Sequence, residues 1–189
     1  GSNNELAHAA AMRVTKELGK LYNPLFLYGG VGLGKTHLLQ AIGNKVSAEN
    51  KDRKVLYISA ERLTADIVEA IGNNTIDELK NRYAKLDLLM IDDIQFIAGK
   101  TKTQEIVFST FNELYGKNKQ ILLSSDRPPQ AIPAMEERLR SRFQGGMIAD
   151  VGAPDFETRL AILKLKLLGK NSSLDEDTLV YIATHIQKN

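Results

Sequence analysis

The stretch Leu25-Phe26-Leu27-Tyr28-Gly29-Gly30-Val31-Gly32-Leu33-Gly34-Lys35-Thr36 decides the fold. Its first four residues predict a short buried strand, and a glycine-rich turn then opens directly into a helical pattern. The turn satisfies the phosphate-loop spacing G-x-x-x-x-G-K-[ST] in full. Glycines let backbone N–H groups approach phosphate oxygens, and the following helix directs its positive end at the same anion. A chance match or a plain turn is the alternative, but strand, loop and helix agree. We therefore predict a nucleoside triphosphate site.

Two loop residues and three aspartates carry the predicted chemistry of this site. Lys35 can reach the β- and γ-phosphates, and the Thr36 hydroxyl can ligate Mg²⁺. Asp92 follows four apolar residues and is expected to hold Mg²⁺ through water, while Asp93 could orient or deprotonate the attacking water. Asp126 ends the next strand on the same carboxyl edge, which makes it a candidate sensor of the γ-phosphate. Aspartates at strand ends are also common in ordinary loops and turns. It is the presence of the phosphate loop that favours the functional roles here.

Composition bounds the class of protein. The chain has 189 residues, of which 43% are apolar and 25% charged, as in an ordinary globular domain. Its net charge of +2 implies that any nucleic-acid site must be local. The absence of cysteine excludes disulfides, thiolate catalysis and cysteine-ligated metals. No apolar run approaches membrane-spanning length and no signal peptide is visible, so we expect a cytoplasmic location.

Strand and helix patterns alternate along the chain, which predicts an α/β fold with a parallel sheet covered by helices on both faces. The expected strands are 25–28, 54–59, 88–91, 120–125 and 147–151. Two helices are expected between the second and third strands, and the second begins with a capping box formed by Thr75 and Glu78. A short arginine-bearing helix is expected over 134–143. The composition shifts near Pro154, where we expect the boundary to a small helical appendage.

Arg138 and Arg142 lie four residues apart and share one helix face, with Arg140 pointing elsewhere. Such arginines are usually solvated or paired with carboxylates such as Glu136 or Glu137. In an oligomeric ATPase, one of them would reach the γ-phosphate held by a neighbouring subunit.

With these features in place, the chain resembles the AAA+ ATPase domain family of the bacterial replication initiator DnaA. The resemblance runs from about Asn4 to the end and is carried by NPLFLYGGVGLGKTHLLQAIGN (23–44), IDDIQF (91–96), SDRP (125–128) and RLRSRF (138–143). These motifs are far more specific than a phosphate loop alone. The resemblance implies a P-loop NTPase fold with sheet order 5-1-4-3-2, and it identifies residues 60–85 with the family's initiator-specific helical insertion.

The resemblance also implies a weak ATPase that acts as a nucleotide switch, with ATP or ADP and Mg²⁺ bound. It assigns the role of the arginine finger to Arg142 and that of the arginine in the adjacent sequence box to Arg138. It assigns the role of the sensor aspartate to Asp126. The implied nucleotide-binding residues are Asn4, Gly29, Gly30, Val31, Gly32, Leu33, Gly34, Lys35, Thr36, His37 and Arg138. The implied partners are further copies of the chain in a head-to-tail helical filament, single-stranded DNA, origin DNA and the replicative helicase. Contacts to single-stranded DNA map onto Val68, Lys100 and Lys102.

Departures from the family limit this expectation. The family often has arginine where this chain has Lys102, which keeps the charge but loses the planar fork. Residues 3–153 correspond to the nucleotide-binding core and 154–189 to a partial lid that stops before the expected sensor-2 arginine. The C-terminal domain that reads origin boxes is absent, and Gly1-Ser2 resembles the remnant of an expression tag. Without the sensor-2 arginine, we expect hydrolysis and ATP binding by this fragment to be weaker than in the whole protein.

Two other functions stay open at this point. A helicase loader or DnaA-like regulatory adaptor would act through protein contacts, and a partner-binding N-terminal segment would favour it. The insertion helices together with Lys100 and Lys102 favour the initiator, although an isolated Lys-x-Lys is usually a solvated loop. A metabolic P-loop kinase would need a substrate-binding lid where this chain has the arginine helix.

Overall fold

A five-stranded parallel sheet forms the centre of the protein in the computed structural model, which describes residues 4–168 and 174–186. The strands are β1 (Leu25–Tyr28), β2 (Val55–Ser59), β3 (Leu88–Asp92), β4 (Gln120–Ser125) and β5 (Met147–Asp150). They lie in the order β2-β3-β4-β1-β5, and every pairing is parallel. The predicted order 5-1-4-3-2 is confirmed, since it is the same order read from the other edge. The predicted tag remnant, Gly1-Ser2, lies outside the described residues.

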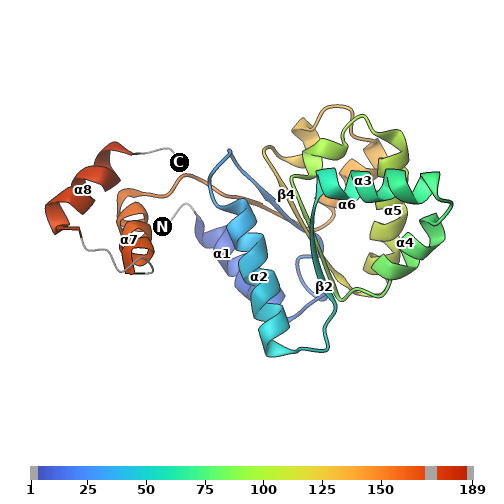
Figure 1. Ribbon diagram of the computed structural model, residues 1–189, viewed down its shortest axis with the longest axis horizontal. Coiled ribbons are helices and arrows are strands. Elements are labelled where there is room, and N and C mark those ends of the chain that lie inside the picture. Colours follow the sequence, from blue (N-terminus) through green and yellow to red (C-terminus); the bar gives the residue numbers. More distant parts are fainter. Residues whose placement is uncertain (1–3, 169–173, 187–189) are drawn as a thin grey trace.

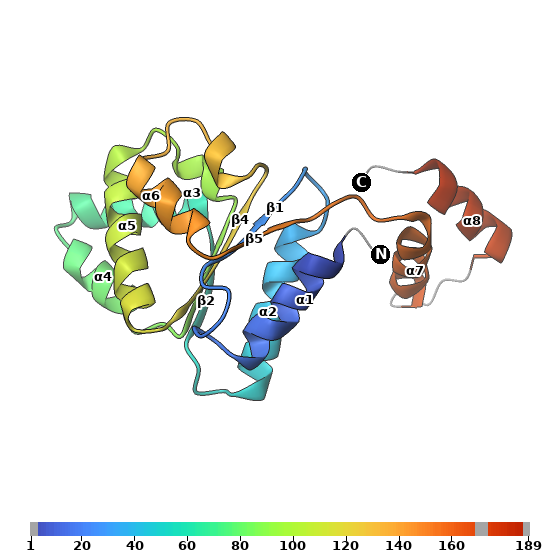
Figure 2. The same cartoon turned by 180° about the vertical axis from the view of Figure 1, so that it is seen from behind.

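Helices cover both faces of this sheet, as predicted. Figures 1 and 2 show one group of helices on each face of the sheet. The first group is α1 (Glu5–Lys16) and α2 (Lys35–Glu49); the second is α3 (Ala60–Gly72), α4 (Ile76–Tyr83), α5 (Thr101–Gly116) and α6 (Glu137–Gln144). Two short 3-10 helices, η2 (Ile94–Ile97) and η3 (Pro129–Ala131), follow β3 and β4.

The alternation of side chains along each strand divides the core in two. On β1, Leu25 and Leu27 pack with the apolar faces of α1 and α2, and Phe26 points into the larger cluster below α3, α5 and α6. Phe26 meets Phe143 of α6 with ring centroids 5.9 Å apart. A strand buried on both faces reads as a continuous apolar run, which is why the pattern at 25–28 and 88–91 predicted strands reliably.

Two local predictions were wrong in detail. Thr75 does precede α4, but its side chain makes no capping hydrogen bond. The Thr75 N–H, which a capping box gives to Glu78, donates instead to Ala70 O (2.8 Å). The arginine helix begins at Glu137 rather than at residue 134, because Ala134 has a left-handed φ of 51° and the N–H of Glu136 donates to Gln104 Oε1 (2.7 Å).

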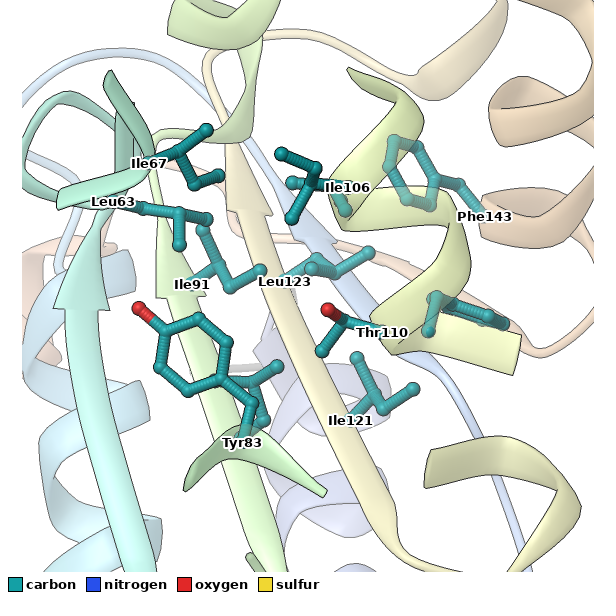
Figure 3. A pocket seen from close by; sticks show the side chains of 12 residues that line it. Leu63, Ile67, Tyr83, Ile91, Ile106, Thr110, Ile121, Leu123 and Phe143 are labelled. Carbon is teal, nitrogen blue, oxygen red and sulfur yellow. The ribbon is translucent and has the colours of Figure 1, made fainter. Parts of the chain in front are cut away.

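A small cavity lies in the larger core cluster, between the sheet and α3, α4 and α5 (Figure 3). Its lining is apolar except for the hydroxyls of Tyr83 and Thr110, and neither hydroxyl has a hydrogen-bond partner among the described residues. The cavity leaves about 10 Å³ for the centre of a water molecule, which corresponds to roughly one water. It is therefore a packing feature of the core and far too small for a nucleotide.

Beyond β5 the chain leaves the sheet and forms the pair α7 (Phe156–Leu168) and α8 (Glu176–His185). Figures 1 and 2 show this pair standing apart from the sheet, joined to it by the segment after β5. Arg159 links the two helices, since its Nε donates to Ala183 O (2.8 Å) and its Nη1 to Pro154 O (2.7 Å). Asp175 caps α8 by accepting a hydrogen bond from the N–H of Thr178 (2.8 Å). Within residues 4–168 and 174–186, no helix is long and apolar enough to cross a membrane.

Candidate nucleotide site

The glycine-rich loop joins β1 to α2 at the carboxyl edge of the sheet. Gly34 precedes α2 in a left-handed conformation with φ 97°. Gly29 has φ 156°, and a Cβ built on it would lie 2.2 Å from Val151 O. Only glycine fits there, because the backbone of the segment after β5 fills the space that a side chain would take. The loop is thus held against the sheet while Gly30, Val31 and Gly32 face solvent.

Lys35 is the buried cation of the loop. Its side chain is 8% exposed, and its Nζ donates to Gly29 O (2.8 Å) and Gly30 O (2.9 Å). An ammonium group carries three donors and loses much of its hydration on burial, so it needs such partners. The loop carbonyls therefore hold the charge of Lys35 directly beneath the open face of the loop.

Asp92 is the centre of a hydroxyl cluster at the end of β3. Its carboxylate is 3% exposed and accepts hydrogen bonds from Thr36 Oγ1 (2.7 Å) and Tyr57 Oη (2.6 Å) on Oδ2, and from Ser124 Oγ on Oδ1. Ser124 in turn accepts the N–H of Asp93 (2.8 Å). The sequence predicted the proximity of Thr36 and Asp92 but missed Tyr57 and Ser124. Both lie on strands, where a lone hydroxyl gives no local signal.

The Tyr57 hydroxyl stays protonated over the whole physiological range. Burial, with the hydrogen bond to Asp92 and the negative charge of that carboxylate, raises the pKa of Tyr57 to about 12. Tyr57 consequently acts as a donor to Asp92.

Asp93 begins the short helix η2 in a left-handed conformation with φ 55°. Its Oδ1 accepts a hydrogen bond from Gln95 Nε2 (3.2 Å). This backbone conformation is uncommon outside glycine and turns the chain sharply after β3. The two consecutive aspartates thus have different surroundings, since the Asp92 carboxylate is buried and that of Asp93 is partly exposed.

Asp126 follows β4, the strand that lies between β1 and β3. Arg127 binds it with two parallel hydrogen bonds, Nε to Oδ1 (2.9 Å) and Nη2 to Oδ2 (2.7 Å). The hydrogen bond and charge of Arg127 lower the pKa of Asp126, and the positive charge of Lys35 contributes in the same direction. Asp126 therefore lies within the electrostatic reach of the loop lysine, as a residue on this sheet edge should.

Asn4 ties the start of α1 to the segment after β5. Its Nδ2 donates to Gly152 O (3.3 Å), and its Oδ1 accepts the N–H of Gly152 (2.9 Å). Because its side chain is used there, Asn4 makes no capping hydrogen bond to α1. His37, one turn into α2, is exposed.

The three arginines of α6 differ in their interactions. Arg138 is exposed, pairs with Glu136 (2.6 Å) and lies over the Phe108 ring at 4.7 Å. Arg140 turns back to Met135 O (3.1 Å) and Ile132 O (3.4 Å) and pairs with Glu137. Arg142 is exposed, and within the described part of the chain it has no ion pair.

The residues expected to contact DNA are on the surface. Val68 of α3 is 62% exposed, and α3 packs against η2 and α5, the elements on either side of Lys100. Lys100 is exposed, whereas Lys102 pairs with Glu105 at 2.9 Å. This ion pair reduces the local positive charge, and it was not predicted from the sequence.

A divalent cation fits this edge through oxygen atoms. Thr36 donates its proton to Asp92, which leaves the lone pairs of its own oxygen available. In the part of the chain that the structure describes, no group of three or more His, Cys, Asp or Glu could hold a metal by itself. This arrangement suits Mg²⁺, which retains most of its water and binds proteins through one or two oxygens plus phosphates.

Comparison with known proteins decides the family. A sequence profile described as the bacterial DnaA ATPase domain matches residues 1–150. The chain belongs to the bacterial DnaA ATPase domain family. The chromosomal replication initiator protein DnaA of Caldanaerobacter subterraneus subsp. tengcongensis is 52% identical to it over 189 residues. That alignment covers 100% of this chain and 43% of the relative, so the chain spans less than half of the length of that initiator.

Solved DnaA structures have the same fold. Domain III of DnaA from Thermotoga maritima superposes with a TM-score of 0.96 at 45% identity, covering 100% of this chain and 79% of that one. The structure described as replication initiator DnaA bound to AMPPCP and single-stranded DNA superposes with a TM-score of 0.90 at 42% identity. That match covers 100% of this chain and 58% of the other. The likeness to the DnaC helicase loader, with a TM-score of 0.67 at 12% identity, extends to the fold alone. DnaA family membership therefore supports the initiator over the loader and the metabolic kinase.

Proposed function

We propose that the chain is the nucleotide-switch module of a replication initiator, which binds ATP or ADP with Mg²⁺ and hydrolyses ATP slowly. The convergence of Lys35, Thr36 and Asp92 at one sheet edge carries this proposal, because a buried loop cation beside a hydroxyl–carboxylate pair is what a Mg²⁺-nucleotide needs. In the proposed ATP state, copies assemble head to tail at the origin and hold single-stranded DNA. A cytoplasmic location goes with this role.

The loop would bind the phosphates through its backbone N–H groups and through Lys35, whose ammonium exchanges loop carbonyls for phosphate oxygens. Thr36 would hold Mg²⁺ directly and Asp92 through water. When bound, Mg²⁺ neutralises charge on the β- and γ-phosphates. Asn4, His37 and Arg138 complete the proposed nucleotide-binding set, together with the loop residues Gly29, Gly30, Val31, Gly32, Leu33 and Gly34.

Asp93 is proposed as the group that orients the attacking water and accepts its proton, since its carboxylate is partly exposed beside the buried Asp92. Asp126 is proposed to sense the γ-phosphate, which would require its pair with Arg127 to open or turn. Asp93→Asn should leave ATP affinity unchanged and slow phosphate release. Unchanged phosphate release would remove Asp93 from this role.

Arg142 is proposed to act on a neighbouring copy. Arg142 is exposed and has no ion pair with any residue that the structure describes, so it can reach another subunit without first breaking such a pair. Arg138 is held by its ion pair with Glu136 and by the Phe108 ring beneath it. It is therefore better suited to a fixed contact within the proposed nucleotide-binding set than to reaching another subunit. A C-terminal region beyond this chain would bind duplex origin DNA, and the replicative helicase is a further proposed partner of the whole protein.

Single-stranded DNA is proposed to bind at Val68, Lys100 and Lys102. A similar initiator is described as bound to AMPPCP and single-stranded DNA, and in this chain Val68 and Lys100 are both exposed. Lysines there would neutralise phosphates, so binding should be strongly salt-dependent and little dependent on sequence. Val68 offers an apolar surface without charge.

Anisotropy titrations of a labelled oligonucleotide across a salt series, with AMPPCP and with ADP, test this function. We expect tighter binding with AMPPCP, and a log–log salt slope that becomes shallower by roughly 0.7 for each phosphate that a Lys100→Ala/Lys102→Ala variant no longer neutralises. Val68→Ala should weaken binding and keep the slope, whereas Lys117→Ala, a paired lysine at the far end of α5, is the control. Equal binding in both nucleotide states, or an unaltered double variant, would contradict the DNA-binding proposal.

A further inference from the structure

Three hydroxyls from three separate elements converge on the Asp92 carboxylate. Thr36 comes from the start of α2, Tyr57 from β2 and Ser124 from β4. An ionised carboxylate offers about four lone-pair positions, two on each oxygen. Thr36 and Tyr57 together fill Oδ2, and Ser124 takes one position on Oδ1. Counting the described residues only, one acceptor position of Asp92, on Oδ1, is left for a further donor.

Tyr57 is the member of this cluster that no assigned role explains. Thr36 belongs to the phosphate-loop motif, and Ser124 also accepts the N–H of Asp93, which joins β3 to β4. Tyr57 lies on β2, an edge strand, and 36% of its surface is exposed. A tyrosine this exposed can give its hydroxyl to water, yet its hydroxyl reaches 2.6 Å from a carboxylate that is 3% exposed.

The simpler view is that Tyr57 is an edge-strand residue whose hydroxyl takes the nearest acceptor. In that view, the hydrogen bond of Tyr57 contributes only to the stability of the fold. The lone-pair count favours a further role, because without the Tyr57 hydroxyl Oδ2 would regain a free position that could compete with Oδ1 for a water of the cation. Groups that orient a metal ligand in this way usually change metal affinity by about 10- to 100-fold when they are removed.

We propose that Tyr57 is a positioning residue of the Mg²⁺ site, which saturates Oδ2 of Asp92 together with Thr36 and thereby reserves Oδ1 for a water of the bound cation. The inference rests on the proposed function, since it requires that Asp92 assists Mg²⁺-nucleotide binding. It adds a residue of the edge strand β2 to a site whose other members come from the loop after β1 and from α2, β3 and β4.

The test compares Tyr57→Phe with wild type and with Tyr115→Phe, which removes the hydroxyl of an exposed tyrosine at the end of α5. ATP affinity is measured by calorimetry in EDTA and over a Mg²⁺ titration, and thermal unfolding of the nucleotide-free proteins is recorded beside it. Mg²⁺ should raise the ATP affinity of both proteins above its value in EDTA. We expect the Mg²⁺ concentration that produces half of this increase to be at least about ten times higher for Tyr57→Phe than for wild type. The affinity of Tyr57→Phe in EDTA should equal that of wild type, and Tyr115→Phe should match wild type throughout.

The remaining outcomes separate the inference from the proposed function. A Tyr57→Phe variant with the Mg²⁺ profile of wild type overturns the inference, and so does one that loses affinity equally in EDTA and in Mg²⁺. If wild type binds ATP no better in Mg²⁺ than in EDTA, or does not bind it, the proposed function fails and the inference falls with it.

Discussion

Gly29 should be intolerant of any side chain, and the structure gives the size of the effect. A Cβ at this position would lie 2.2 Å from Val151 O and 3.1 Å from the carbon of that carbonyl, and the first of these distances is well inside the 3.0 Å that real Cβ atoms respect. The clash cannot relax by turning a flexible side chain, because the obstacle is backbone. The N–H of Gly29 donates to Ser125 O (3.2 Å), and that of Val151 donates to Tyr28 O (2.7 Å). Moving either segment would strain a hydrogen bond at the sheet edge.

Gly29→Ala therefore combines overpacking with an unfavourable φ, and we expect a loss of about 3 kcal/mol in the free energy of unfolding. For a chain of this size the melting temperature should fall by about 6–12 °C. Gly72→Ala is the matched control, since a Cβ at the end of α3 meets nothing within 4 Å. It should stabilise the protein by roughly 0.4–1 kcal/mol. Thermal unfolding followed by circular dichroism measures both, and a Gly29→Ala variant that melts at the temperature of wild type refutes the reasoning.

Three further results are expected. Lys35→Met should lower ATP affinity by about 100-fold in calorimetry, the value of two charge-assisted hydrogen bonds, while Lys45→Met on the same helix should not change it. Arg142→Ala should bind ATP normally but fail to assemble with AMPPCP in sedimentation; wild-type assembly would make it a plain surface charge. Because Arg127 lowers the pKa of Asp126, their pair stabilises the fold above the ordinary aspartate pKa and ceases to do so as pH falls through the lowered one. In urea unfolding, the free energy of unfolding of wild type should therefore exceed that of Arg127→Gln at neutral pH. The two values should be equal in acid below the lowered pKa, and a difference that persists there would contradict the stabilising role of this pair.

The sequence predicted most of the fold because its signals are local. The apolar runs at 25–28 and 88–91 are continuous, as strands buried on both faces require, and the glycine loop after the first run has one common structural context. The strand order is a different matter. It came from the family resemblance, since no residue pattern in a parallel sheet specifies which strands are neighbours.

Predictions about side-chain partners were less reliable, for a physical reason. The hydrogen bond of Tyr57 to Asp92 depends on the register that pairs Ser59 with Asp92 across β2 and β3, which sequence spacing does not reveal. Thr75 had the right residue type for a cap, but the backbone had already used the N–H that the capping box needs. Lys102 was predicted to contact DNA phosphates, and the structure shows it paired with Glu105, three residues further along the same helix, a partner that was not predicted.

The most direct test of the account is a calorimetric titration of the wild-type chain with ATP in the presence of Mg²⁺, followed by competition with ADP. Lys35, Thr36 and Asp92 form one site in each chain, so the account predicts saturable binding of one ATP per chain that ADP displaces and that EDTA weakens. Absence of saturable binding at millimolar ATP, or binding that Lys35→Met leaves unchanged, would contradict it.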